Sequence, residues 1–162
     1  MRLCSRAVPI FVLEVCKVKI KKIDHVSVIV NDLSAAKAFF VDLGLEVKGE
    51  WEMEGELMGY AAGLDNAKVA CVGLGTQDGQ TWLELIKFIS PANDIEIKQP
   101  LANTLGIRHI AFSVEDIEAV VAKLKIKGFE RFSDIQQYEN SYKLCYVRGP
   151  EGIILELAQE IK

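Results

Sequence analysis

Two histidines and two glutamates recur at matching positions and have the chemistry of a metal site. His25 and His109 are the only histidines among the 162 residues. Each is followed, later in its half of the chain, by a glutamate set among leucines: Glu84 in WLEL (82–85) and Glu156 in IILEL (153–157). A carboxylate among apolar neighbours is costly unless a cation compensates it. Two imidazole nitrogens and two carboxylate oxygens suit Ni, Co, Zn, Mn or Fe(II), so the four residues predict one divalent metal ion.

Each of these residues, taken alone, has an ordinary structural explanation. A single histidine in a strand is more often structural than a ligand, and a single glutamate can belong to a sheet edge or a salt bridge. Two His–Glu pairs in matching positions favour a metal site over a vestigial one that no longer binds metal. An octahedral ion with four protein ligands keeps two adjacent open positions for two neighbouring substrate oxygens. Such an ion acts as a Lewis acid on a developing enolate, and a nearby carboxylate can move the proton.

An internal repeat relates the two pairs. The segment 23–46 aligns with the segment 107–130 at a constant offset of 84 and without a gap. The identical pairs are Ile23/Ile107, His25/His109, Val30/Val114, Asp32/Asp116, Ala35/Ala119, Ala38/Ala122, Gly44/Gly128 and Glu46/Glu130. The two glutamates match at an offset of 72, so the second copy is shorter between its helix and its last strand.

Each copy predicts a strand, a helix and three further strands. Asp32 and Asp116 offer N-cap oxygens to the helices, and Gly44 and Gly128 sit where a helix ends in a left-handed residue. The first copy predicts strands over 23–30, 45–53, 68–74 and 81–88 and a helix over 32–43; the second predicts strands over 107–114, 129–133, 142–148 and 152–159 and a helix over 116–127. The expected fold class is α+β, with two tandem βαβββ modules forming a curved mixed sheet around a metal trough and the helices outside.

Side chains alternate between the two faces of a strand, and this alternation assigns all four predicted ligands to the sheet face opposite the helices. In the first strands the helix-facing residues are Val26, Val28, Val30, Ile110, Phe112 and Val114, and in the last strands they are Leu83, Leu85, Leu155 and Leu157. The histidines and glutamates therefore point away from the helices and can meet in one trough if the modules pair around a pseudo-two-fold axis. Trp82 shares a face with Glu84, so it either walls the trough or belongs to the core.

The composition argues against a nucleic-acid-binding protein and against a membrane-spanning one. A net charge of −4 and a pI near 5.3 give no basic stripe for nucleic acid. No apolar run approaches the roughly 20 residues that span a bilayer. The four cysteines, Cys4, Cys16, Cys71 and Cys145, lie far apart, which predicts reduced thiols in a cytoplasmic protein, although a Cys4–Cys16 disulfide stays open. We expect an extension without chemistry over 1–20, modules over 21–90 and 106–162, and a linker over 91–105.

The chain resembles the vicinal oxygen chelate superfamily, which includes glyoxalase I, methylmalonyl-CoA epimerase, extradiol dioxygenases and the fosfomycin and bleomycin resistance proteins. The resemblance covers about residues 20–160 and is carried by IDHVSVIVNDL, TWLELIKF, IRHIAFSVEDI and GPEGIILEL. The His, Glu, His, Glu set is similar to that of bacterial-type glyoxalase I and of the epimerases, whereas dioxygenases typically use two histidines and one carboxylate. The resemblance therefore implies proton transfer on a small α-oxygenated carbonyl or thioester substrate, with Glu84 or Glu156 as both ligand and base.

The resemblance leaves the substrate and two further functions open. Glyoxalase I enzymes carry a basic, glycine-rich stretch that helps to hold glutathione, but residues 134–153 contain no Gly-Gly. Tyr138, Tyr142, Lys143 and Arg148 either shape the pocket or are ordinary strand and turn residues. The alternatives to a lyase or isomerase are a ligand-sequestering module of the resistance type and an extradiol dioxygenase. Members of this superfamily commonly pair modules within or between chains, so we expect a homodimer that binds a small molecule.

Overall fold

A computed structural model describes residues 20–92 and 100–161. The first module holds β1 (His25–Ile29), α1 (Leu33–Leu43), β2 (Glu46–Glu54), α2 (Glu56–Ala62), β3 (Lys68–Gly75) and β4 (Trp82–Ser90). The second holds β5 (His109–Ser113), α3 (Ile117–Ile126), β6 (Gln136–Tyr138), β7 (Tyr142–Arg148), a short 3-10 turn (Pro150–Gly152) and β8 (Ile154–Glu160). Among the residues described, no helix is long and apolar enough to cross a membrane.

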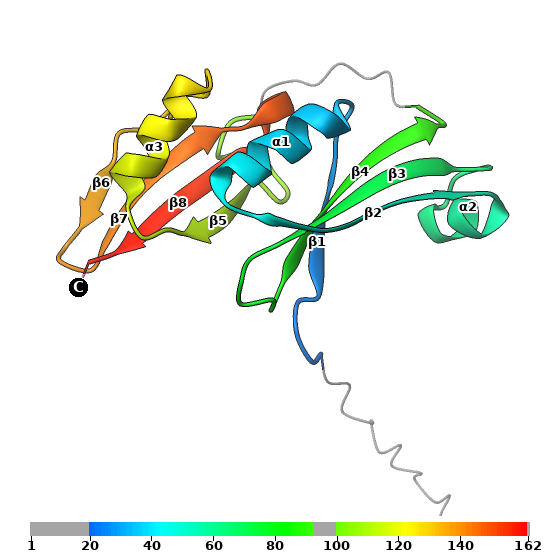
Figure 1. Cartoon of the computed structure of the whole chain (residues 1–162), viewed down its shortest axis with the longest axis horizontal. Helices are drawn as coiled ribbons and strands as arrows, with labels where there is room; N and C mark the ends of the chain where they lie inside the picture. Colours follow the sequence, from blue (N-terminus) through cyan, green and yellow to red (C-terminus); the bar gives the residue numbers. More distant parts are fainter. Residues whose placement is uncertain (1–19, 93–99, 162) are drawn as a thin grey trace, which may run out of the picture.

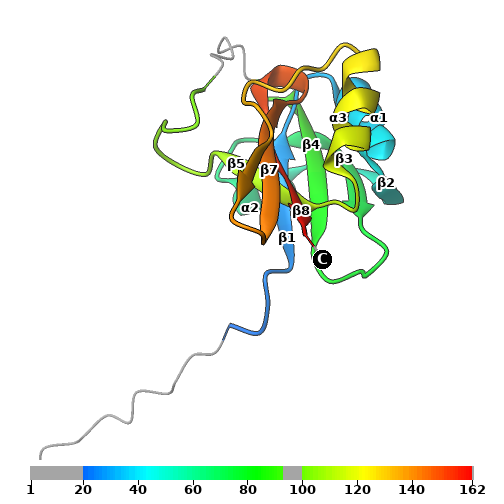
Figure 2. The same cartoon turned by 90° about the vertical axis from the view of Figure 1, so that its left-hand side faces the viewer.

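Each module forms its own four-stranded mixed sheet, in the order β1-β4-β3-β2 in the first and β5-β8-β7-β6 in the second (Figure 1). In both sheets the first strand pairs in parallel with the last strand, and the other neighbours are antiparallel. α1 and α3 lie on the same side of the two sheets (Figure 2). The prediction of two tandem βαβββ modules with outer helices is therefore confirmed, and the described strands form two open sheets.

The predicted caps fix both helices. The carboxylate of Asp32 accepts a hydrogen bond of 2.9 Å from the N–H of Ala35, and that of Asp116 accepts one of 2.9 Å from Ala119. These bonds satisfy N–H groups that the first helical turn leaves free. α1 ends at Gly44, whose φ of 118° is accessible to glycine at little cost.

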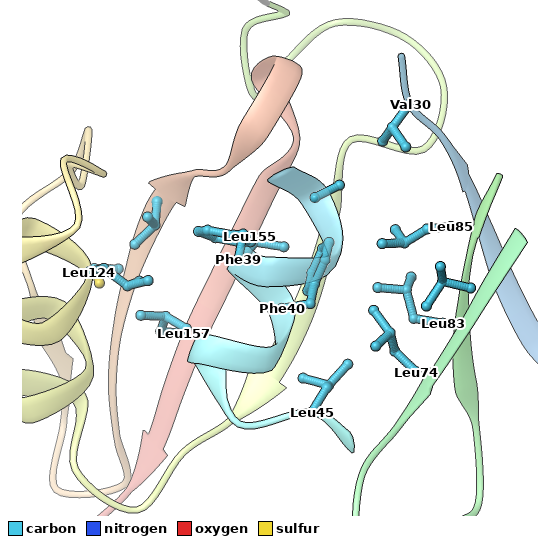
Figure 3. Close-up of a cluster of buried hydrophobic side chains, with 14 of the residues drawn as sticks. Val30, Phe39, Phe40, Leu45, Leu74, Leu83, Leu85, Leu124, Leu155 and Leu157 are labelled. Atoms are coloured by element: carbon cyan, nitrogen blue, oxygen red, sulfur yellow. The ribbon is translucent and has the colours of Figure 1, made fainter. Parts of the chain in front are cut away.

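One hydrophobic core joins the two modules. It contains every residue that the alternation assigned to the helix-facing side, either buried or packed against the buried cluster. The ring of Phe39 meets that of Phe129 at 4.6 Å, and Phe40 meets Phe112 at 6.3 Å. Figure 3 shows Phe39 beside Leu155 of the second module, with α1 between the leucines of the two sheets. Side chains on α1 therefore tie the modules together.

One local prediction is wrong, and one helix was not predicted. The strand expected over 129–133 is wrong: Arg131 forms only an isolated bridge with Val147, and the fourth strand of this sheet is β6, farther along the chain. Phe129 enters the core and Phe132 stacks on Tyr146, so these two aromatic residues anchor an irregular segment at two separate places. The structure also contains the short helix α2, which the sequence did not predict.

Some predictions fall on other parts of the chain or remain open. Cys4, Cys16 and the proposed N-terminal extension lie outside the described residues, apart from residue 20. Cys71 and Cys145 are buried free thiols, as expected for reduced cysteines. The module and linker boundaries stay predictions.

A carboxylate from the second module holds the chain just before α1. Glu151 accepts hydrogen bonds of 2.8 and 2.9 Å from the N–H of Asn31 and one of 2.6 Å from the N–H of Asp32. Its backbone has a φ of 52°, which is unusual for a residue other than glycine. The contact bridges residues about 120 positions apart, so it couples the two modules.

Replacing Glu151 with alanine should therefore lower the free energy of unfolding by about 1–3 kcal/mol, the range for losing hydrogen bonds to a charged group. Urea unfolding monitored by circular dichroism measures the change. Glu139→Ala is the matched control, because Glu139 has a φ of 51° and an exposed side chain. Equal destabilisation by both substitutions would assign the effect to the backbone conformation and not to the bridge.

Candidate functional site

The first His–Glu pair lies on β1 and β4, on the sheet face opposite the helix. Nε2 of His25 is 3.7 Å from Oε2 of Glu84. The hydroxyl of Ser27 donates a hydrogen bond of 2.7 Å to the same carboxylate oxygen. The His25 side chain is 40% exposed and that of Glu84 only 12%, so the imidazole forms the open rim and the carboxylate the floor.

The second pair repeats this geometry on β5 and β8. Nε2 of His109 is 3.4 Å from Oε2 of Glu156, and the side chains are 39% and 20% exposed. Ala111 replaces the serine of the first module, and Tyr146 of β7 lies directly opposite Glu156. Burial raises the pKa of Tyr146, and its hydrogen bond to Glu156 raises it further. The phenol therefore stays protonated and donates to this carboxylate.

An additional carboxylate orients the first histidine. Oδ2 of Asp24 is 3.1 Å from Nδ1 of His25, and Lys22 lies 3.0 Å from the other carboxylate oxygen. The hydrogen bond to His25 and then the contact with Lys22 lower the pKa of Asp24 to about 2, so this group is ionised. An acceptor at Nδ1 favours the tautomer whose Nε2 lone pair is free to bind a metal. Arg108 occupies the matching place before His109, so only the first histidine has this partner.

The surroundings of the two pairs differ. In the first module the ring of Trp82 lies 4.8 Å from His25 and 6.0 Å from Trp51. Both indoles cover Gly73, where a Cβ atom would come within 3.2 Å of Trp82. Trp82 thus stands beside the pair, on the face that its alternation predicted. In the second module Tyr146 takes the place of Gly73 and lies 5.4 Å from His109.

The four predicted ligands come together as two pairs in the single chain. Within residues 20–92 and 100–161, no group of three or more histidine, cysteine, aspartate or glutamate side chains is arranged to hold a metal ion. Ser27 and His109 line a common groove of about 700 Å³ between the edge strands β1 and β5. Of the four predicted ligands, only His109 lines this groove, and metal binding by the four residues stays a prediction.

The donor set of each pair suits a divalent ion. An imidazole nitrogen and a carboxylate oxygen less than 4 Å apart can bind the same ion. Cys71 lies on the same face as Glu84, but burial, and then the charge of Glu84, raise its pKa to about 11. Its thiol is protonated at neutral pH, so a thiolate ligand or nucleophile is not expected here.

Some residues of this face escaped the sequence interpretation. Asp24 and Tyr146 were not predicted as site residues. The sequence does carry a signal for Asp24, because its counterpart in the repeat, Arg108, has the opposite charge, and the two histidines that follow therefore have different neighbours. Tyr146 becomes visible only through the β7–β8 register. Lys143 belongs to the opposite face, where it pairs with Glu118 of α3 at 2.6 Å. Tyr138 and Tyr142 are exposed at the β6–β7 turn.

Comparison with known proteins places this geometry in context. Residues 22–157 match the Glyoxalase/Bleomycin resistance protein/Dioxygenase superfamily. The chain is 27% identical over 142 residues to the uncharacterized protein YaeR of Escherichia coli (strain K12), covering 87% of this chain and 98% of YaeR. It is 30% identical over 142 residues to the uncharacterized protein YwkD of Bacillus subtilis (strain 168), with the same coverage of 87% and 98%. A crystal structure of a glyoxalase family protein from Bacillus cereus superposes with a TM-score of 0.86 at 38% identity, covering 91% of this chain and 99% of that one.

Proposed function

Since the chain belongs to the glyoxalase/bleomycin resistance protein/dioxygenase superfamily, we propose that it is a divalent-metal-dependent lyase or isomerase. Its substrate would be a small α-oxygenated carbonyl compound or thioester. The observation that carries the proposal is the repeated His–Glu pair, with Nε2–Oε2 distances of 3.7 and 3.4 Å on exposed sheet faces. Both carboxylates are partly buried, and each receives a hydroxyl hydrogen bond that holds it in position within its own pair.

The proposed ligands are His25, Glu84, His109 and Glu156. When bound, the metal would supply a Lewis acid that polarises the substrate carbonyl. One of the two glutamates would then take the proton from the carbon beside that carbonyl and return it at the neighbouring carbon. Ser27 and Tyr146 hold the glutamates in place, and the ring of Trp82 lies beside His25. We place this chemistry in the cytoplasm, where the thiols of Cys71 and Cys145 stay reduced.

We further propose that a second copy of the chain completes the site. Each chain presents two open His–Glu pairs, and four ligands are needed. A two-fold axis that sets the first module of one copy against the second module of the other would form two equivalent sites. It would also cover the sheet faces that carry the histidines, which are 39–40% exposed in the single chain.

The test combines metal content with proton exchange. We expect purified protein to retain one divalent ion per chain by mass spectrometry of the metals. In deuterated water the loaded protein should exchange the α-proton of a hydroxy or keto thioester, or convert the methylglyoxal–glutathione hemithioacetal. Loaded protein that exchanges no proton in any of these compounds would contradict the lyase or isomerase.

A ligand-sequestering module is the second candidate, and the paired indoles of Trp51 and Trp82 favour it. The two indoles lie edge to face over Gly73, with an interplanar angle of 61°, and make an apolar corner that could hold a ring. Such a module would bind its ligand tightly with no turnover. The exchange experiment separates the two functions, because sequestration requires no movement of a proton.

Asp24→Asn should weaken metal binding about tenfold or more, the usual effect of removing a carboxylate behind a metal-binding histidine. Asparagine keeps the shape but can present its amide NH2 to Nδ1, which favours the wrong tautomer. Titration calorimetry with nickel measures the change. Lys22→Met is the matched control, because Lys22 contacts Asp24 and not His25. Equal affinities in wild type and Asp24→Asn would show that Asp24 has no positioning role.

A further inference from the structure

Arg148 lies at the end of β7 on the same sheet face as His109 and Glu156. The strand register sets Arg148 opposite Ile154, and Ile154 opposite His109, so these residues form one row across the sheet. Tyr146 and Glu156 belong to the adjacent row. Neighbouring strands lie about 4.8 Å apart, which places the backbones of Arg148 and His109 about 10 Å apart.

The guanidinium of Arg148 is held in place but lacks an anionic partner. Its central carbon lies 4.8 Å from the centroid of the Phe132 ring, and Phe132 stacks on Tyr146 at 5.7 Å. One terminal nitrogen, Nη1, is buried and has no hydrogen-bond partner. None of the ion pairs between described residues includes Arg148. A buried donor on a cation is costly unless an acceptor satisfies it, so this group is suited to a ligand anion.

The matching place in the first module is neutral. Gly75 lies opposite Trp82 there, as Arg148 lies opposite Ile154 in the second module. Lys48 packs over Gly75, but its ammonium is already paired with Glu46 at 2.8 Å. The unpaired cation is thus specific to the second module, beside His109 and Glu156.

We propose that Arg148 and Phe132 form a subsite for a carboxylate group of the substrate. This rests on the proposed function and names its substrate class: a small acid whose α-oxygenated carbonyl reacts beside Glu156. The planar guanidinium can bind both oxygens of a carboxylate, and the ring of Phe132 holds its plane fixed.

Two chelating probes test the subsite. Acetohydroxamate presents two neighbouring oxygens to the metal and has no other charged group. Succinic monohydroxamate presents the same two oxygens and also has a carboxylate, separated from the hydroxamate carbonyl by two CH2 groups. Calorimetry on nickel-loaded wild type should show about tenfold or tighter binding of the carboxylated probe. Arg148→Met should abolish this preference while keeping the affinity for acetohydroxamate, and Arg148→Lys should keep part of it. Arg131→Met, which removes an arginine already paired with Asp134, should leave the preference unchanged.

Equal affinities of the two probes in wild type would overturn the subsite, as would a preference that survives in Arg148→Met. If neither probe binds because nickel is not retained, the proposed metal function fails, and metal-free protein then decides the subsite alone. There, succinate but not succinamide should move the Nε–H resonance of Arg148 in a nitrogen-15 spectrum, assigned through its loss in Arg148→Met. No movement would overturn the inference. If Arg148→Met does not fold, Arg148→Lys supplies the assignment and the comparison.

Discussion

Mixing two metal-free variants that each lack one His–Glu pair should restore metal binding that neither variant has alone. The variants are H25A/E84A, without the first pair, and H109A/E156A, without the second. If each site combines the first module of one copy with the second module of its partner, a mixed dimer contains one intact site and one empty site. After subunit exchange about half of the dimers are mixed, so about one quarter of the wild-type metal content should return.

The measurement is nickel per chain after exchange and dialysis, with each variant incubated alone as the control. Circular dichroism must show that both variants are folded. We expect them to fold because the histidine side chains are 39–40% exposed and do not belong to the core. Tagging the variants differently and purifying the mixed dimer should raise the content to about half of wild type. A mixture that stays free of metal, although mixed dimers are recovered and wild type binds nickel, would contradict a site shared between two chains.

Glu84→Gln and Glu156→Gln should have unequal effects on turnover. Glutamine keeps the volume and an oxygen ligand but can no longer accept a proton. Replacing the glutamate that acts as base should lower kcat by a factor of about 10²–10⁴ while much of the metal is retained. Replacing the other should mainly weaken metal binding. The measurements are α-proton exchange in deuterated water and nickel affinity, made on the same preparations.

Glu139→Gln is the control for this pair, because Glu139 is an exposed glutamate at the β6–β7 turn. It should leave exchange and metal affinity at wild-type values. Losses of exchange that follow lost metal equally in both variants would argue against a glutamate base. They would favour the sequestering module, in which both residues act only as ligands.

The first strand, the helix and the last strands of each module could be predicted because their signals are local. The ungapped repeat placed both helices, and Asp32 and Asp116 marked their starts. The segment after α3 was wrongly predicted as a strand because the contacts that shape it are not local. Phe129 packs on Phe39, and Phe132 stacks on Tyr146 of β7. α2 lies between Gly55 and Gly63 in a stretch with too little apolar periodicity to reveal it.

The candidate site could be predicted only within each module. Alternation placed His25 and Glu84 on one face because both lie in regular strands with a fixed register. The separation of the two pairs depends on how the modules pack, which contacts such as Phe39–Phe129 and Glu151–Asn31 decide. The orphan nitrogen of Arg148 likewise required three-dimensional contacts, since its sequence neighbours do not reveal an unpaired charge.

The difference between Gly73 and Tyr146 has a stereochemical consequence. Two identical half-sites would accept a substrate in either of two orientations related by the pseudo-two-fold axis. Here one carboxylate lies beside a glycine under two indoles and the other beside a phenol. A planar, prochiral intermediate can match these unequal surroundings in only one orientation, so each of its enantiotopic faces meets a different glutamate. If the chain catalyses the proposed proton transfer, proton return should therefore be enantioselective and give one enantiomer of the product.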